Sequence, residues 1–248
     1  MTLLRNSWAV FLRELGAYFL SPVAYVVIFV FLLVNGITFH VFAKIFARDP
    51  RAITLVVESL FGFALFWILP LSPILTMRLL AEEKRLGTLE LLMTAPVTET
   101  QVVLGKFAAA QAFYTLIWLS LLPLFGFLAV LGRPDWGPIA SVYIGLFAFG
   151  LLTNSIGLFA SALTRNQLVS AILALSGNLV LYSVYLVETL LPEDPDIDRI
   201  LHYLSFTKHF GSEYSRGIID IRYFFLYGSL AVFFLFFSVR AVEAGKWK

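Results

Sequence analysis

The 248-residue sequence contains no cysteine, which excludes disulfides, thiolate metal sites and a cysteine nucleophile. Charge is scarce as well, because Asp, Glu, Lys and Arg make up 14% of the residues, against about 25% in an ordinary soluble domain. Hydrophobic residues make up 60%, more than a soluble fold of this length could bury. The composition therefore excludes a soluble enzyme and a disordered chain. A net charge of only +2 also argues against a nucleic-acid partner.

Motifs for catalysis are absent too. Gly105-Lys106 is followed by Phe107, and position 100 is Thr, so the sequence has no phosphate-binding Walker A loop. Neither a His-Glu-x-x-His zinc motif nor a Gly-x-Ser-x-Gly nucleophile turn occurs. We therefore expect no catalytic, cofactor-binding or metal-binding residues, and no ATP hydrolysis by this chain.

Long apolar runs are what the sequence does have. Six windows carry no Asp, Glu, Lys or Arg, and they are 15–43, 59–77, 107–132, 136–164, 166–187 and 223–239. A helix needs about 20 apolar residues to cross the core of a bilayer. The predicted fold is therefore all-α, a polytopic membrane protein with six transmembrane helices in a single domain over 1–248. The spans are expected near 22–42, 56–77, 99–131, 137–163, 167–190 and 222–242.

An even number of spans places both termini on the same side of the membrane. That side would hold ten Lys and Arg residues against eight on the other, and basic residues favour the cytoplasmic side. We therefore expect both termini and residues 78–98 in the cytoplasm, with 44–55 and 191–221 outside. No span has a charged residue near its middle, where ion-coupled transporters usually place one.

Residues 1–21 are predicted to form an interfacial helix. Between residues 3 and 20 one helical face is apolar and the opposite face is polar, a pattern typical of a helix that lies on the membrane surface. Ser21-Pro22 then has the spacing of a cap and a first-turn proline, which would begin the first span. The alternative is that this segment is simply the start of that span. The apolar face consists of Leu4, Trp8, Phe11, Leu12, Leu15 and Phe19.

The connection between the second and third spans is charged, yet it has clear helix signals. Gly87 suits the left-handed residue that ends a helix. Thr88 can cap a short helix that Pro96 stops, and Thr98 and Gln101 then have the spacing of a capping box. The short helix is apolar over more than half of its circumference, which indicates a protein partner or contact with lipid headgroups. Its apolar residues are Leu89, Leu91, Leu92 and Met93.

The same connection resembles the signature of ABC-2 type permeases, the membrane subunits of one class of ATP-binding-cassette exporters. The resemblance lies in Glu82-Glu83-Lys84-Arg85, in Gly87-Thr88-Leu89-Glu90 and in Pro96. The stretches 18–25 and 202–210 resemble gliding-motility-type permeases within that family.

The resemblance implies that a cytoplasmic coupling helix within 78–98 docks on a separate ABC ATPase subunit, which binds the ATP. It further implies two permease copies, identical or paralogous, that form a translocation pathway in a bacterial cytoplasmic membrane. A membrane anchor that transmits force in an ATPase-driven machine would fit equally well, and an ion-coupled secondary transporter less well. The coupling residues that the resemblance assigns are Glu82, Glu83, Arg85, Gly87, Thr88, Leu89, Glu90, Leu92, Met93 and Pro96.

The long loop near 191–221 is predicted to contain two short helices. Asp194 before Pro195 suits a helix cap, and the helix over 195–205 has an apolar stripe that we expect to pack on the outer ends of the spans. A second helix over 207–215 would be closed by Gly217. Such a pair resembles the re-entrant helices of ABC-2 permeases. The stripe consists of Ile197, Ile200, Leu201 and Leu204.

Two polar groups deserve separate interpretations. His202 and His209 lie near four acidic residues, but without the spacing of metal ligands, so helix caps and a solvated face are the favoured explanation. Asn35 and Asn178 lie within spans, where they could line a conduit or could instead form hydrogen bonds between helices.

Overall fold

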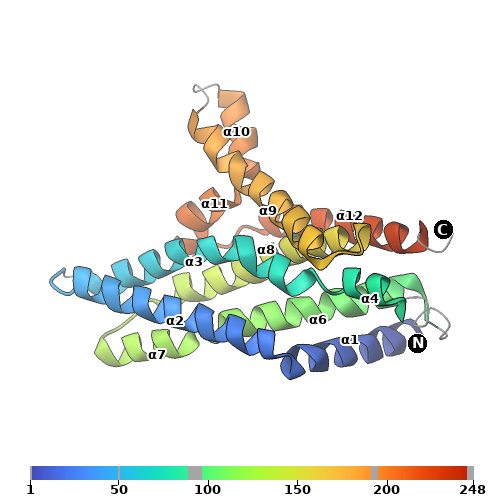
Figure 1. Cartoon of the computed structure of the whole chain (residues 1–248). Helices are drawn as coiled ribbons and strands as arrows, with labels where there is room; N and C mark the ends of the chain where they lie inside the picture. The colour runs from blue at the N-terminus through green and yellow to red at the C-terminus, as the bar shows by residue number, and fades with distance from the viewer. Residues whose placement is uncertain (1, 50, 89–96, 191–194, 245–248) are drawn as a thin grey trace.

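The computed structural model describes residues 2–49, 51–88, 97–190 and 195–244, and every element in these ranges is helical. Figure 1 shows the helices arranged as an elongated bundle. The helices are α1 (Thr2–Leu20), α2 (Pro22–Ile45), α3 (Ala52–Thr76), α4 (Ala81–Leu86), α6 (Glu99–Leu119), α7 (Leu122–Leu131), α8 (Trp136–Leu163), α9 (Gln167–Leu190), α10 (Pro195–Leu204), α11 (Phe206–Lys208), η1 (His209–Glu213), η2 (Tyr214–Arg216) and α12 (Ile221–Ala244).

The predicted all-α polytopic membrane fold is confirmed. Five helical segments in the described ranges are long and apolar enough to cross a membrane, and the bent α3 makes a sixth. One of the five is Glu99–Leu131, the pair α6–α7, which matches the span expected over 99–131. Within this span the helix breaks at Ser120-Leu121 before Pro123, whose ring nitrogen cannot donate a helical hydrogen bond.

The ends of the bundle differ in what they contain. Figure 1 shows the start of α1, the end of α12 and α4 together at one end, and the α2–α3 connection with α7 at the other. We call these the inner and the outer end. Of the spans, α8 is the most enclosed, since 72% of its apolar stretch is buried, against 17% for α2 and for α9. The bundle is therefore built around α8.

Two glycines let other helices approach α8 closely. A Cβ atom at Gly150 would lie 2.4 Å from a ring carbon of Tyr114 on α6. A Cβ atom at Gly157 would lie 2.0 Å from the hydroxyl of Thr76 on α3. Both distances are shorter than any real contact, so only glycine fits at these positions. Small residues at helix contacts are typical of packing within a membrane.

The N-terminal helix has a partner that its amphipathic pattern does not reveal. α1 packs lengthwise along α6 (Figure 1), and the ring of Tyr18 stacks on that of Phe113 with centroids 4.8 Å apart. The expected interfacial helix is therefore not a separate surface segment. Part of its apolar stripe faces outward, since Trp8 is 59% and Leu12 51% exposed, whereas Phe11 and Leu15 pack against the core. α1 thus has one face held by protein and another free to contact lipid.

The predicted short helices of the outer loop are present, but the first packs differently from the expectation. α10 contacts the end of α9 and stands away from the other spans (Figure 1), which leaves Ile200 61% and Leu204 43% exposed. The expected packing on the outer ends of the spans is therefore wrong for these two side chains. The reason is that α9 diverges from the bundle, and α10, which packs on the end of α9, lies away from the other spans. Asp194, its expected cap, lies outside the described residues. The second helix continues through α11, η1 and η2 and ends at Gly217, whose φ is +82°.

Candidate functional site

The inner end of α3 is tied to the corner between α1 and α2. The hydroxyl of Tyr18 donates to the carbonyl of Leu75 at 2.6 Å. That carbonyl is free because the amide of Leu79 bonds to Thr76 instead, where the helix tightens. Arg78 lies over the Tyr18 ring, 5.1 Å from its centroid, and donates to the Ser21 hydroxyl at 3.0 Å.

The predicted start of the first span at Pro22 is confirmed, but Ser21 does not cap it with its side chain. Its hydroxyl accepts the hydrogen bond from Arg78, which lies 57 residues later in the sequence. The local pattern predicted the helix start correctly because the first helical position makes no hydrogen bond through its backbone nitrogen, so proline is tolerated there. The pattern could not predict that the guanidinium of Arg78 would bind Ser21.

A side chain of α8 caps the N-terminus of the short helix α4. The Ser161 hydroxyl accepts from the backbone amides of Leu80 and Ala81, both at 3.0 Å, and donates to the carbonyl of Met77 at 3.1 Å. Ser161 thus acts as the N-terminal cap of α4 from a different helix, satisfying amides that no local side chain reaches. One turn later, the Lys84 ammonium donates to the carbonyl of Ala162. Burial, aided by nearby Arg165, lowers the Lys84 pKa.

Four charged residues from three helices meet beside α4, and we call them the inner ion cluster: Arg13, Glu14, Glu83 and Lys106. The Lys106 ammonium lies 3.0 Å from the Glu14 carboxylate and 2.9 Å from that of Glu83. Arg13 contacts the same two carboxylates at 2.5 and 3.0 Å. The Lys106 side chain is only 1% exposed, so solvent screens its two ion pairs little, whereas the Arg13 side chain is 49% exposed.

Attraction between the charges of the cluster offsets the energetic cost of burying them. Burial by itself would raise the pKa of Glu14, but attraction to Lys106 and hydrogen bonds from Arg13 outweigh it, so that pKa lies below its usual value. Glu14 is therefore a carboxylate at neutral pH. Two carboxylates and two cations compensate each other, which is the condition under which buried charges are tolerated.

The predicted coupling residues divide into inward-facing and outward-facing groups. Glu83 binds Lys106 and Arg13 within the chain, so it is not free to face a partner protein. Arg85 is 59% exposed and lies 3.9 Å from Glu82, which is 38% exposed. The sequence predicted that these charges pair with each other or with a partner. In the structure Glu83 pairs within the chain, whereas Arg85 and, beyond it, Gly87 and Thr88 are exposed.

Two helix signals of this connection are confirmed, the one at Gly87 and the one at the start of α6. Gly87 ends α4 in the left-handed conformation with φ +71°, and Thr98 and Gln101 form the capping box at the start of α6. Residue 88 is helical, and the Thr88 hydroxyl reaches back to the carbonyl of Glu83 at 3.4 Å. The remaining predicted coupling residues lie outside the described ranges, and they are Leu89, Glu90, Leu92, Met93 and Pro96.

The contribution of Lys106 and Ser161 was missed. Lys106 was counted only as one basic residue near the membrane, although a Lys one residue before a long charge-free window is a signal for a paired charge. Ser161 gives no signal in the sequence, because its partners lie 81 and 80 residues away.

The two predicted conduit residues are buried within the chain. Asn178 donates to the carbonyl of Leu69 at 3.3 Å. In a regular helix that carbonyl would accept from residue 73, but Pro73 has no amide hydrogen. Asn178 on α9 therefore supplies the donor that Pro73 lacks on α3. Asn35 donates to Phe31 in its own helix. Both contacts favour a packing role over a conduit.

The described residues contain no group of three or more His, Asp and Glu that could hold a metal ion. The four acidic residues near the histidines, Glu193, Asp194, Asp196 and Asp198, have side chains outside the described part of the structure. His209 is buried in what we call the outer aromatic cluster: His209, Glu213, Tyr223 and Tyr227. Its ring stacks on Tyr223 with centroids 3.5 Å apart, and its Nδ1 lies 2.6 Å from the Tyr227 hydroxyl. Tyr223 donates to Glu213 at 2.7 Å.

His209 is held neutral by this environment. Its Nε2 lies 3.0 Å from the carbonyl of His202, which can only accept, so Nε2 carries the hydrogen and Nδ1 accepts from Tyr227. Burial lowers the pKa of His209 to about 4. The outer end is therefore held together by a neutral ring, whereas the inner end is held together by full charges.

The family model described as ABC-2 family transporter protein matches residues 71–212, more than half of the chain. The matched range contains α4, Glu83 and Lys106 of the inner ion cluster, and Ser161. No curated protein matches the chain.

Proposed function

The chain belongs to the ABC-2 family of transporter proteins, and from this we propose that it is the permease subunit of an exporter driven by a separate ATPase subunit. A permease of an ABC-type transporter is a multi-pass membrane component, which agrees with the helical bundle. The finer parts of the proposal are export as the direction, cytoplasmic termini, two paired copies and docking of the ATPase at residues 78–98.

One observation carries the coupling part of the proposal: α4 is held by three other helices at once. α8 contacts it through Ser161, while α1 and α6 contact it through Arg13 and Lys106. A force applied to the 78–98 connection would therefore reach these three helices together. A loop that served only as a turn would not need such attachments.

The mechanism follows from this arrangement. ATP-driven closure of two ATPase subunits would push the connection of each permease copy and shift the bundle between two conformations. The energetic requirement is that the ATPase binds these two conformations with different affinity. The inner ion cluster and Ser161 would transmit the movement, while the exposed Glu82 and Arg85 and the apolar residues after Gly87 would contact the ATPase.

The orientation is supported by the position of the chain ends. The start of α1, the end of α12 and α4 lie at one end of the bundle (Figure 1), as an even number of spans requires. Since an ATPase subunit is cytoplasmic, this end would face the cytoplasm.

The test separates docking from coupling. The tagged full-length chain is co-expressed with its ATPase and purified in detergent, and the amount of co-purified ATPase is measured. Leu92→Asp should remove the ATPase, because apolar anchors at an interface centre contribute about 2 kcal/mol or more. Leu131→Asp is the matched control at the outer end, where Leu131 is 64% exposed. It should keep the ATPase.

A second variant addresses transmission. Lys106→Gln should still co-purify with the ATPase, but ATP turnover should no longer respond to the presence of the permease. Full co-purification and normal turnover of Leu92→Asp would remove the main support for the proposal. Loss of the ATPase in both aspartate variants would mean that the charge harms the fold rather than a docking surface.

A further inference from the structure

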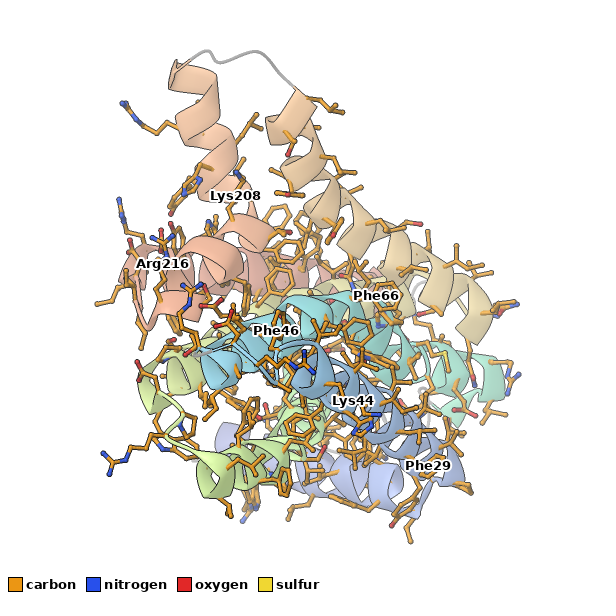
Figure 2. The ribbon with its side chains drawn as sticks, turned by 90° about the vertical axis from the view of Figure 1, so that its left-hand side faces the viewer. Phe29, Lys44, Phe46, Phe66, Lys208 and Arg216 are labelled. Atoms are coloured by element: carbon orange, nitrogen blue, oxygen red, sulfur yellow. The ribbon has the colours of Figure 1, made fainter. Side chains whose placement is uncertain are left out.

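A pocket of about 460 Å³ lies between α3, α9 and the α11–η1 segment, away from the inner ion cluster. Volumes of this size are typical of small-molecule sites. Figure 2 labels Phe66 on α3 and Lys208 on α11, two of the residues that line it from different elements. The other side chains that line it are Leu69, Tyr182, Tyr185 and Thr207.

The walls of the pocket are mainly apolar and aromatic, and they open toward the surface that faces lipid. Phe66 is 61% exposed on a helix that spans the membrane, so one wall is shared with the bilayer. Leu69 and Tyr182 extend this wall on α3 and α9. Such a surface suits a hydrocarbon chain that enters sideways from the membrane.

Polar side chains line the pocket from two elements, the tyrosines of α9 and the pair Thr207 and Lys208 of α11. The Thr207 hydroxyl is buried and has no hydrogen-bond partner among the described residues. A buried hydroxyl normally has a partner, so an unsatisfied one in a pocket wall indicates a bound group. Lys208 also lines the pocket, with its ammonium 5.8 Å from the ring centre of Tyr185, another residue of the pocket wall.

Two glycines keep this space open. Gly62 on α3 and Gly211 on η1 both line the pocket, and a Cβ atom at either position would have no heavy atom within 4 Å. A larger side chain at Gly62 would therefore fill the empty space without a clash. This offers a way to block the pocket while leaving its walls intact.

We propose that this pocket binds an anionic lipid, with a hydrocarbon chain against Phe66 and Leu69 and a phosphate or carboxylate group at Thr207 and Lys208. The hydroxyl donates one hydrogen bond and the ammonium supplies the opposite charge. The same chemistry is present in a resident anionic phospholipid and in a free fatty acid. The site is complete within one chain and does not depend on the ATPase.

The experiment uses native mass spectrometry of the full-length chain in detergent with added dioleoyl-phosphatidylglycerol, dioleoyl-phosphatidylcholine or oleate. One molecule of the anionic phospholipid should be retained per chain at least tenfold better than the zwitterionic one. Oleate that displaces it at equal concentration would identify a fatty-acid site, and oleate that does not would identify a phospholipid site. Equal retention of both phospholipids would overturn the proposal.

Variants locate the binding. Gly62→Leu should abolish retention, whereas Gly126→Leu should not, because Gly126 on α7 is equally open but lies elsewhere. Lys208→Gln should lower retention about tenfold and Thr207→Val severalfold, with the melting temperature of each variant as a check on folding. If Lys208→Gln lowers retention while Gly62→Leu matches Gly126→Leu, the lipid binds a charged surface and the pocket is not its site.

Discussion

At each end of the bundle, side-chain contacts hold distant segments together, but the chemistry of these contacts differs between the two ends. At the inner end, four full charges from α1, α4 and α6 hold together segments up to 92 residues apart. At the outer end, a neutral imidazole and two phenols join η1 to α12. The stability of the charged contacts requires every partner, because a buried charge that loses its partner is costly. The stability of the stacked neutral rings requires close packing and an unprotonated imidazole.

The largest effect is expected from breaking the inner ion cluster. Lys106→Met removes the buried cation and leaves Glu14 and Glu83 with only the half-exposed Arg13 as a partner. The loss of one partner from a buried ion pair costs about 3–5 kcal/mol, and the remaining contacts to Arg13 place the expected cost near the lower end of that range. The measurement is the free energy of unfolding in detergent. The matched control is Arg85→Met, whose exposed pair with Glu82 is worth about 0–1 kcal/mol. Similar losses in the two variants would show that the cluster is no stronger than a surface ion pair.

The second largest effect is a pH dependence of stability that differs between the two ends. Below pH 6.5 an unfolded histidine binds a proton that the folded His209, with a pKa of about 4, does not bind. The stability contributed by neutral His209 is therefore complete above pH 6.5 and is lost as the pH falls toward 4, about 2 kcal/mol between pH 7 and pH 5. The lowered pKa of Glu14 works in a different window, since its contribution is lost only below the usual value of 4.5.

The pH dependence is tested with His209→Gln, which should remove most of the slope between pH 7 and pH 5. The groups that face His209 are His202, Glu213, Asp220, Tyr223 and Tyr227. His40→Gln is the control, because His40 lies exposed on α2 and should leave the slope unchanged. A slope that survives in His209→Gln would assign the pH dependence to another group.

The smallest effect concerns a single hydroxyl of the outer aromatic cluster. Tyr223→Phe removes the hydrogen bond to Glu213, which should cost about 1.5 kcal/mol because the acceptor is charged. Tyr203→Phe is the comparison, since its hydroxyl makes only an exposed contact of 3.4 Å to the Arg222 carbonyl. It should cost less than about 0.5 kcal/mol. Equal costs would indicate that Glu213 is solvated rather than held by Tyr223.

The features that sequence reasoning predicted correctly are local ones. The charge-free windows predicted the spans correctly because a helix that crosses a bilayer needs about 20 residues with few or no charges. Gly87 and the box of Thr98 and Gln101 were predicted correctly because their partners lie within a few residues. The break before Pro123 was also local, and it was missed because a continuous apolar window concealed it.

The features that were missed are contacts between distant segments. No pattern around Ser21 indicates Arg78, and no pattern around Ser161 indicates the start of α4. Likewise, the stripe of α10 showed that one face is apolar but not which surface it would meet. Hydrophobic periodicity shows which face of a helix is apolar, while what that face contacts depends on how the whole bundle packs.

The two glycines of α8 restrict how the bundle can move. Gly150 and Gly157 are seven residues apart, about two helical turns, and each receives a side chain from a different helix, Tyr114 from α6 and Thr76 from α3. Sliding either helix along α8 would press these side chains against positions that carry a Cβ atom. The axial register of α3, α6 and α8 is therefore locked in two places. Movements of the permease that preserve this register, such as rotation of the three helices as one body with α2 and α9 adjusting around them, avoid that steric cost.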